Sequence, residues 1–210
     1  MDLSFLKNLK IELEPVIEKA GEIIMEVYES DHAINEKSDG SPVTEADTKS
    51  EKIIVSAIKR ICPNIPIISE ENSDSHKFNV DGPFFLVDPL DGTKEFLKKD
   101  GKGAFTVNIA LIKNEVPLFG MVNAPALKRS FSGIVGDGSV EKNDTQSTVI
   151  SISESKKHNI IAVASSSHRD EKTNRWLESN KIERTISVGS SLKFCLLATG
   201  EADVYPRFAP

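Results

Sequence analysis

Apolar residues recur at three- and four-residue steps near the start of the chain, and this pattern predicts a long amphipathic helix. The repeating positions are Leu6, Leu9, Leu13, Val16, Ile17, Ala20, Ile24 and Val27. Pro15 lies inside this segment and is expected to bend the helix, because proline lacks the amide proton that the helix ladder needs. After a polar stretch over residues 30–41, a second helix is expected to begin with Thr44 as its N-cap and to end before Pro63.

Shorter apolar runs bounded by polar or turn residues predict strands. Two of them cover residues 65–68 and 84–87. Residues 105–112 and 116–123 resemble the two arms of a hairpin, and residues 131–135 predict a further antiparallel strand before a glycine-rich turn. This part of the chain is therefore expected to form a largely antiparallel sheet.

Between residues 141 and 148 the chain becomes polar and loses its periodicity, which predicts a domain boundary. We expect an N-terminal α+β domain that binds metal over residues 1–143 and a C-terminal α/β domain that binds substrate over residues 144–210. Strand and helix patterns alternate in the second part, over residues 159–164, 171–179, 185–188, 191–199 and 202–205. This order predicts a β-α-β-α-β unit.

Composition and charge exclude several classes of protein. The 210 residues carry a net charge of −6 and contain no basic stripe, so a nucleic-acid surface is not expected. Cys62 and Cys195 lack zinc-like spacing and favour a reducing cytoplasm. No signal peptide is recognised at the N-terminus, and no segment approaches the roughly 18 apolar residues of a membrane span. The expected location is the cytoplasm, either free or in peripheral association with the inner membrane.

The segment FFLVDPLDGTKEF contains the sharpest chemical signal, because an apolar run ends in Asp88 and Asp91. Together with Glu70, which follows another strand, these acids would repel one another without a cation. Magnesium takes oxygen ligands and relieves such repulsion, and Asp88 can bridge two ions. Pro89 is expected to end the strand and free the Leu90 carbonyl.

A tight turn at Gly92 would then deliver the Thr93 hydroxyl toward the same centre. Residues 94–99 are expected to begin a short helix whose backbone N–H groups favour phosphate. This arrangement suits hydrolysis of a phosphate ester.

Each feature also has a plainer interpretation. An isolated Asp-Gly pair is a common turn, and Thr44 followed by Asp47 is an ordinary helix start. Of the four histidines, only His168 lies where a ligand could be met, with a loop-stabilising role as the alternative. Ser190 and Lys193 favour anions but also suit helix capping. The joint occurrence of acids at strand ends favours the metal-site hypothesis.

The stretches SPVTEAD, ISEE, VDPLDGTKEF, FTVNIALI, SSSH, GSSLKFC and ADVYPRF together resemble the inositol monophosphatase superfamily. Within it, the extension to DGTKEF, GSSLKFC and YPRF is similar to the 3′(2′),5′-bisphosphate nucleotidase branch. The resemblance implies a layered αβαβα sugar-phosphatase fold. It also implies removal of the 3′-phosphate from 3′-phosphoadenosine 5′-phosphate in sulfur assimilation and nucleotide recycling, with two or three Mg²⁺ ions, lithium sensitivity and a monomer or homodimer.

The resemblance further implies roles for individual residues. Glu70, Asp88 and the Leu90 carbonyl would bind the first metal, and Asp88 with Asp91 the second. Glu70, Thr93 and Asp47 would be the catalytic residues that hold and orient the attacking water. The residues implied to contact substrate are Asp91, Gly92, Thr93, His168, Ser190, Lys193 and Arg207.

The resemblance also implies a continuation, because relatives follow the YPRF stretch with a WD motif whose aspartate completes the second metal site. The C-terminal part is therefore expected to be incomplete in these 210 residues. As a whole polypeptide the chain could then be a non-catalytic module that binds nucleotide or metal, whereas as part of a longer chain the site would be complete. A third alternative is an inositol or fructose phosphate phosphatase, although Ser190, Lys193 and Arg207 favour a substrate with a second phosphate.

Overall fold

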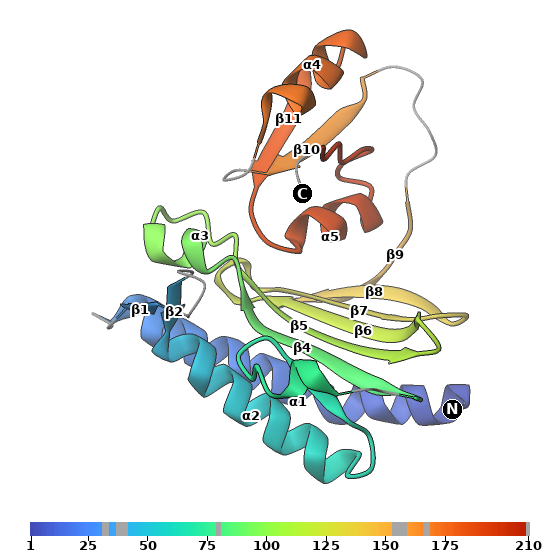
Figure 1. Ribbon diagram of the computed structural model, residues 1–210. Helices are drawn as coiled ribbons and strands as arrows, with labels where there is room; N and C mark the ends of the chain where they lie inside the picture. Colours follow the sequence, from blue (N-terminus) through green and yellow to red (C-terminus); the bar gives the residue numbers. More distant parts are fainter. Residues whose placement is uncertain (31–33, 37–41, 79–80, 153–158, 166–168, 209–210) are drawn as a thin grey trace.

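A seven-stranded sheet dominates the computed structural model, and helices α1 and α2 cover one of its faces (Figure 1). The structure describes residues 1–30, 34–36, 42–78, 81–152, 159–165 and 169–208. Neighbouring strands follow the order β3-β4-β5-β6-β7-β8-β9, and every pair is antiparallel except β3 with β4. The strands are β3 (Ile67–Ser69), β4 (Phe84–Asp91), β5 (Thr106–Lys113), β6 (Val116–Ala124), β7 (Arg129–Ile134), β8 (Gly138–Asn143) and β9 (Ser147–Ile150). The expected, largely antiparallel sheet is confirmed.

Helices α1 (Leu3–Glu29) and α2 (Glu45–Ile61) arise from the two periodic segments recognised in the sequence. The Asp2 side chain accepts a 2.8 Å hydrogen bond from the Phe5 amide and caps α1, which runs unbroken through Pro15. Thr44 caps α2 as expected. Each helix turns its apolar stripe toward the sheet, so burial rather than intrinsic propensity stabilises both.

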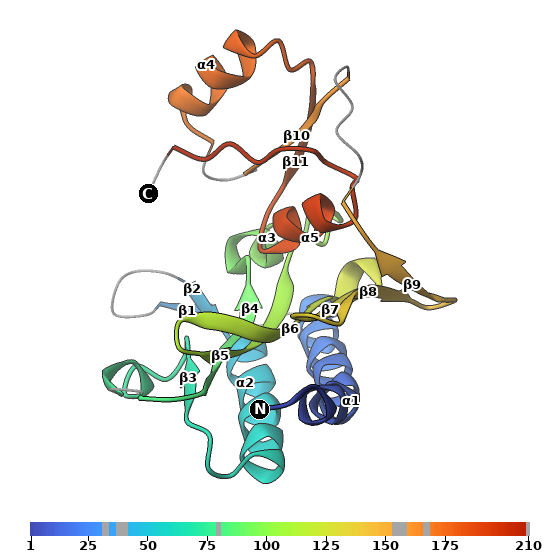
Figure 2. The ribbon, with the colours of Figure 1, turned by 90° about the vertical axis from the view of Figure 1, so that its right-hand side faces the viewer.

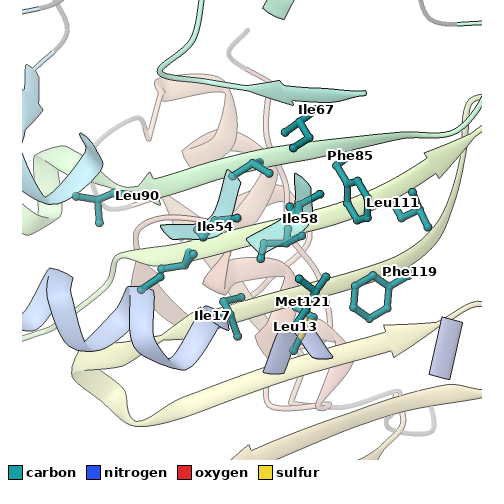
Figure 3. Packing of buried hydrophobic residues seen from close by; sticks show 14 of the residues in the cluster. Leu13, Ile17, Ile54, Ile58, Ile67, Phe85, Leu90, Leu111, Phe119 and Met121 are labelled. Carbon is teal, nitrogen blue, oxygen red and sulfur yellow. The ribbon is translucent and has the colours of Figure 1, made fainter. Parts of the chain in front are cut away.

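The main core lies between these helices and the central strands, as Figure 3 shows. Leu13 and Ile17 of α1 and Ile58 of α2 are fully buried. Their side chains meet Phe85 of β4 and Phe119 of β6 in the same cluster. Each buried aliphatic or aromatic side chain contributes roughly 1.5–3 kcal/mol. This core holds the strands that carry the acidic residues.

A second lobe packs against the opposite face of the main sheet (Figures 1 and 2). Its described elements are β10 (Ile161–Ser165), α4 (Glu171–Ser179), β11 (Arg184–Val188) and α5 (Leu192–Ala198). Strands β10 and β11 are parallel, α5 lies between them and the main sheet, and α4 covers their other side. The expected layered αβαβα arrangement is therefore confirmed.

Two local expectations were wrong. Pro89 does not end its strand, because β4 continues to Asp91 through a shift in register. Residues 202–205 do not form a strand, since only Val204 makes a bridge, to Ala162. The polar segment over residues 141–148, where the sequence predicts a domain boundary, contains the end of β8 and the start of β9. These strands lack a strong apolar pattern because their residues are exposed or half-buried, and β9 lies at the edge of the sheet.

Two further features complete the fold. The segment assigned as a polar stretch contains β1 (Ile34–Glu36), which pairs antiparallel with β2 (Pro42–Thr44) directly after that stretch. The domain division at residue 143 stays a prediction, and β9 on its far side pairs with β8. Among the described helices, none combines the length and apolar character that crossing a bilayer requires.

Replacing Leu13 with alanine tests the contribution of the α1 stripe. We expect Leu13→Ala to lower the free energy of unfolding by about 2–5 kcal/mol, because the side chain is fully buried and leaves a cavity. Ile11→Ala on the same helix is the matched control, since Ile11 is 66% exposed and should change stability by no more than about 0.5 kcal/mol. Urea denaturation of both variants measures the difference, and equal losses would contradict the assignment of the stripe.

Candidate active site

Acidic residues gather where β3 and β4 leave the sheet. Because the two strands are parallel, their carboxyl ends lie at the same edge. The Glu70 amide donates to the Val87 carbonyl at 3.0 Å, which extends the pairing one residue beyond β3. This bond places Glu70 next to Asp88, as the sequence predicted.

The two carboxyl groups interact strongly with each other. Burial, the nearby carboxylates of Asp91 and Glu70, and a hydrogen bond with Glu70 raise the pKa of Asp88 to about 9. The Leu90 amide, which donates to Asp88 Oδ1 at 3.2 Å, acts in the opposite direction. Asp88 therefore favours a proton at neutral pH, which means that this position favours added positive charge.

Asp91 has a different environment. Burial raises its pKa, whereas the Ser191 backbone N–H and the charge of Lys193 lower it. Both of these opposing groups come from the second lobe. Asp91 thus connects the acidic edge of the main sheet electrostatically to the second lobe.

The metal roles expected for Glu70, Asp88, Leu90 and Asp91 stay a prediction. Within the part of the chain that the structure describes, no three histidine, cysteine, aspartate or glutamate side chains form a group that could hold an ion. Their chemistry nevertheless fits a divalent cation, because carboxylate and carbonyl oxygens are the donors that Mg²⁺ prefers. The proton affinity of Asp88 points the same way, since a cation would satisfy the same crowded charge.

A bulge in β4 separates the two aspartates. Asp88 pairs with Asn108, and Asp91 pairs with Thr106. The two pairs are therefore three residues apart on β4 but only two residues apart on β5, which defines a β-bulge. The Ser50 hydroxyl of α2 fixes the bulge by donating to the Pro89 carbonyl at 3.0 Å. The extra residue gives both aspartates their own positions at the strand end.

The turn after the bulge orients Thr93. Gly92 has a φ of 90°, and a Cβ there would lie 2.9 Å from the Ala104 carbonyl oxygen, so the position requires glycine. Helix α3 (Thr93–Lys98) begins directly afterwards, as expected. The Thr93 hydroxyl donates to the Leu90 carbonyl at 3.2 Å. Its lone pairs remain able to accept a hydrogen bond.

Asp47 lies at the start of α2. Its Oδ2 accepts from the Thr44 amide at 2.8 Å and from the Thr44 hydroxyl at 2.7 Å, and this reciprocal pair forms a capping box. The plainer interpretation of this pair, an ordinary helix start, is thus confirmed. The catalytic role that the family resemblance implied for Asp47 stays a prediction.

A cavity of about 330 Å³ lies between the two lobes and brings most of the expected site residues together. Those that line it are Glu70, Leu90, Asp91, Gly92, Thr93, Ser190, Lys193 and Arg207. Asp47 and Asp88 are not among the described residues that line it, and His168 lies outside the described residues. Asp88 instead lines a neighbouring cavity together with Glu70 and Asn108. Glu70 and Asp91 therefore line the cavity between the lobes from the side of the main sheet, and Lys193 and Arg207 line it from the second lobe.

Lys193 is held rigidly in this cavity. Only 6% of its surface is exposed, its Nζ donates to the Ser190 carbonyl at 2.6 Å, and the ammonium lies 5.7 Å from the centre of the Tyr205 ring. Burial lowers the pKa of Lys193, and the nearby charges of Asp91 and Glu95 oppose that shift. A fixed, partly desolvated cation of this kind suits recognition of an anion.

The sequence did not identify Ser50 and Asn108 as part of this region. Ser50 lies on the buried face of α2, where a small polar residue gives no distinctive signal. Asn108 interrupts the apolar stretch FTVNIALI, and an amide in a buried strand could have indicated a polar partner. That partner is Ser191, at the start of the helix that the sequence predicts over residues 191–199.

Known proteins resemble this chain over most of its length. A model of the inositol monophosphatase family matches residues 7–210. The 3′(2′),5′-bisphosphate nucleotidase CysQ of Shigella flexneri is 39% identical over 194 residues, which span 91% of this chain and 77% of the relative. The nucleotidase of the same name from Buchnera aphidicola is 41% identical over 194 residues, spanning 90% and 71%. The crystal structure of CysQ from Bacteroides thetaiotaomicron aligns with a TM-score of 0.80 at 35% identity, over 99% of this chain and 82% of that one.

Removing the charge of Asp88 should stabilise the metal-free protein. We expect Asp88→Asn to raise the free energy of unfolding at pH 7.5 by on the order of 1 kcal/mol or more, since one pKa unit corresponds to about 1.4 kcal/mol. The same variant should lose any stabilisation by added Mg²⁺, measured as the change in melting temperature. Asp144→Asn is the control, because Asp144 is exposed in the turn between β8 and β9, where it forms only a surface ion pair with Lys128 among the described contacts. A destabilised Asp88→Asn variant that still responds to Mg²⁺ would contradict the assignment.

Proposed function

The chain belongs to the inositol monophosphatase family, whose members are metal-dependent phosphatases, and from this premise we infer that it is a 3′(2′),5′-bisphosphate nucleotidase. We propose 3′-phosphoadenosine 5′-phosphate as its substrate, AMP and phosphate as its products, and Mg²⁺ as its cofactor. The supporting observation is the cavity in which Asp91 faces Lys193. Acids on one wall suit a metal-bound scissile phosphate, and cations on the other suit a second phosphate.

The second lobe supplies the groups that would bind the nucleotide. Lys193 is buried beside the cavity, and Arg207 is close enough to Lys193 to lower its pKa. Two neighbouring cations repel each other until a phosphate lies between them, so they favour a dianionic group. The Tyr205 hydroxyl is buried and has no hydrogen-bond partner in the described part of the chain, which leaves it able to bind a polar atom of the nucleotide.

The first lobe supplies the groups that would act on the 3′-phosphate. Glu70, Asp88, Asp91 and the Leu90 carbonyl would hold Mg²⁺, which when bound neutralises phosphoryl charge and makes water more acidic. The Thr93 hydroxyl already donates to Leu90, so it can accept a hydrogen bond from the attacking water. A carboxylate oxygen of Glu70 can take the other proton of that water.

These roles give a balanced reaction. The oxygen of the oriented water forms a bond to phosphorus while the bond from phosphorus to the ribose 3′-oxygen breaks. The leaving 3′-oxygen takes a proton from a solvent water to become a hydroxyl, Glu70 returns the proton it accepted to solvent, and inorganic phosphate is released. The rigid turn at Gly92 keeps Thr93 in place, which reduces the entropy lost when the water is positioned.

Phosphate release from 3′-phosphoadenosine 5′-phosphate tests this function directly. We expect Mg²⁺-dependent turnover with kcat/KM at least about tenfold higher than for inositol 1-phosphate, because only the nucleotide offers a second phosphate to Lys193. Asp91→Asn should lower kcat by on the order of 10²-fold or more, whereas Asp144→Asn should leave it unchanged. Nucleotide binding in calorimetry without phosphate release would instead support a binding module.

Replacing Lys193 separates substrate binding from the chemical step. We expect Lys193→Met to raise KM for the bisphosphate about tenfold or more with a smaller change in kcat, since a charged hydrogen bond contributes roughly 1.5–3 kcal/mol. Lys172→Met on the exposed surface of α4 is the matched control. An unchanged KM would contradict a role for Lys193 in substrate binding.

A further inference from the structure

Three polar side chains join the two lobes at the start of α5. Ser191 Oγ donates to Asn108 Oδ1 at 2.6 Å, and Asn108 Nδ2 donates to Thr106 Oγ1 at 3.3 Å. The hydroxyls of Thr106 and Ser191 lie 2.9 Å apart, and because the Ser191 proton is used on Asn108, Thr106 is the donor between them. The three groups therefore form a closed ring of hydrogen bonds, which we call the interlobe clasp.

The clasp lies directly beside the acids of β4. Asn108 is the cross-strand partner of Asp88, and Thr106 is the partner of Asp91. Directly paired residues of antiparallel strands have Cβ atoms roughly 5 Å apart. Ser191 also contacts Asp91 itself through its backbone N–H. The first residue before α5 is thus connected to the strand positions of both aspartates.

The backbones of the two lobes approach closely at this place. A Cβ on Gly189 would lie 2.6 Å from Glu95 Cγ and 3.0 Å from the Ala104 carbonyl oxygen. A Cβ on Gly92 would lie 3.2 Å from Ser190 Cβ. Small displacements of this segment would therefore change its contacts, which makes its position sensitive to the clasp.

Apolar contacts hold α5 on the sheet, and an ion pair between Arg129 of β7 and Glu201 joins the lobes beyond the C-terminal end of the helix. Leu192 and Cys195 pack against Ala124 and Phe131 in a separate small cluster. Such contacts have little directional preference, whereas each hydrogen bond constrains distance and angle. The clasp is also partly shielded from water, since Thr106 is fully buried and Asn108 and Ser191 are half-buried. It is therefore well suited to set where Ser190 and Lys193 lie relative to Asp91.

We propose that Thr106, Asn108 and Ser191 are positioning residues that set the separation between the acids of β4 and the cations of the second lobe. This separation determines the preference for a substrate with two phosphates over one with a single phosphate. The inference rests on the proposed function, because it assigns one phosphate to the acids and the other to Lys193. It assigns no direct contact with substrate to the clasp.

The test compares 3′-phosphoadenosine 5′-phosphate with 3′-AMP, which lacks only the 5′-phosphate. For Ser191→Ala we expect the ratio of the two kcat/KM values to fall about tenfold, through a raised KM for the bisphosphate, while 3′-AMP changes less than about threefold. Thr106→Val should have the same effect, and Ser191→Thr, which keeps the hydroxyl, should restore most of the ratio. Ser187→Ala, on the exposed side of β11, is the matched control.

Calorimetric dissociation constants for the two nucleotides give a readout that does not depend on turnover, and the same loss of discrimination is expected there. A merely structural role would lower the activity toward both substrates equally, and an unchanged ratio in both clasp variants would overturn the inference. A wild-type chain that shows no preference for the bisphosphate would instead contradict the proposed function, so the two failures are distinguishable.

Discussion

Crowding of carboxyl groups at one edge of the main sheet is the constraint from which the rest of this structure follows. Parallel pairing of β3 with β4 forces Glu70 and Asp88 to the same edge, and the bulge in β4 adds Asp91. Burial removes the water that would screen their repulsion, which is why Asp88 holds a proton so strongly. The core beneath these strands and the Ser50 hydroxyl keep the acids in place despite this cost. A site built in this way favours positive charge.

The second lobe supplies positive charge that complements the negative charge of these acids. It places Lys193 and Arg207 on the other wall of the same cavity, so a molecule with separated anionic groups can contact both sides. The chemistry and the recognition are thus divided between lobes, and neither lobe contains a complete site. The relative position of the two lobes is therefore as important for substrate binding as the residues of either lobe. Close contacts at Gly92 and Gly189 and the interlobe clasp around Ser191 lie at this interface.

Local patterns predicted most of the fold and the acidic half of the site. Helical spacing identified α1 and α2, and the apolar runs identified the central strands, because burial imposes those periods. The sequence did not predict β8 and the edge strand β9, because both faces of these strands are partly exposed. The bulge at Pro89 and the contact of Ser191 with Asn108, 83 residues apart in the chain, depend on tertiary packing that no local pattern encodes. The sequence around Asp47 is compatible with both a helix cap and a catalytic role, and the structure tests only the cap.

Crystals soaked in Mn²⁺ give the most direct test of the central claim, because manganese replaces magnesium at oxygen sites and scatters anomalously. The account predicts an anomalous peak within roughly 2.5 Å of carboxylate oxygens of Glu70, Asp88 and Asp91. The absence of such a peak, in a crystal whose soak saturates other manganese sites, would contradict the account.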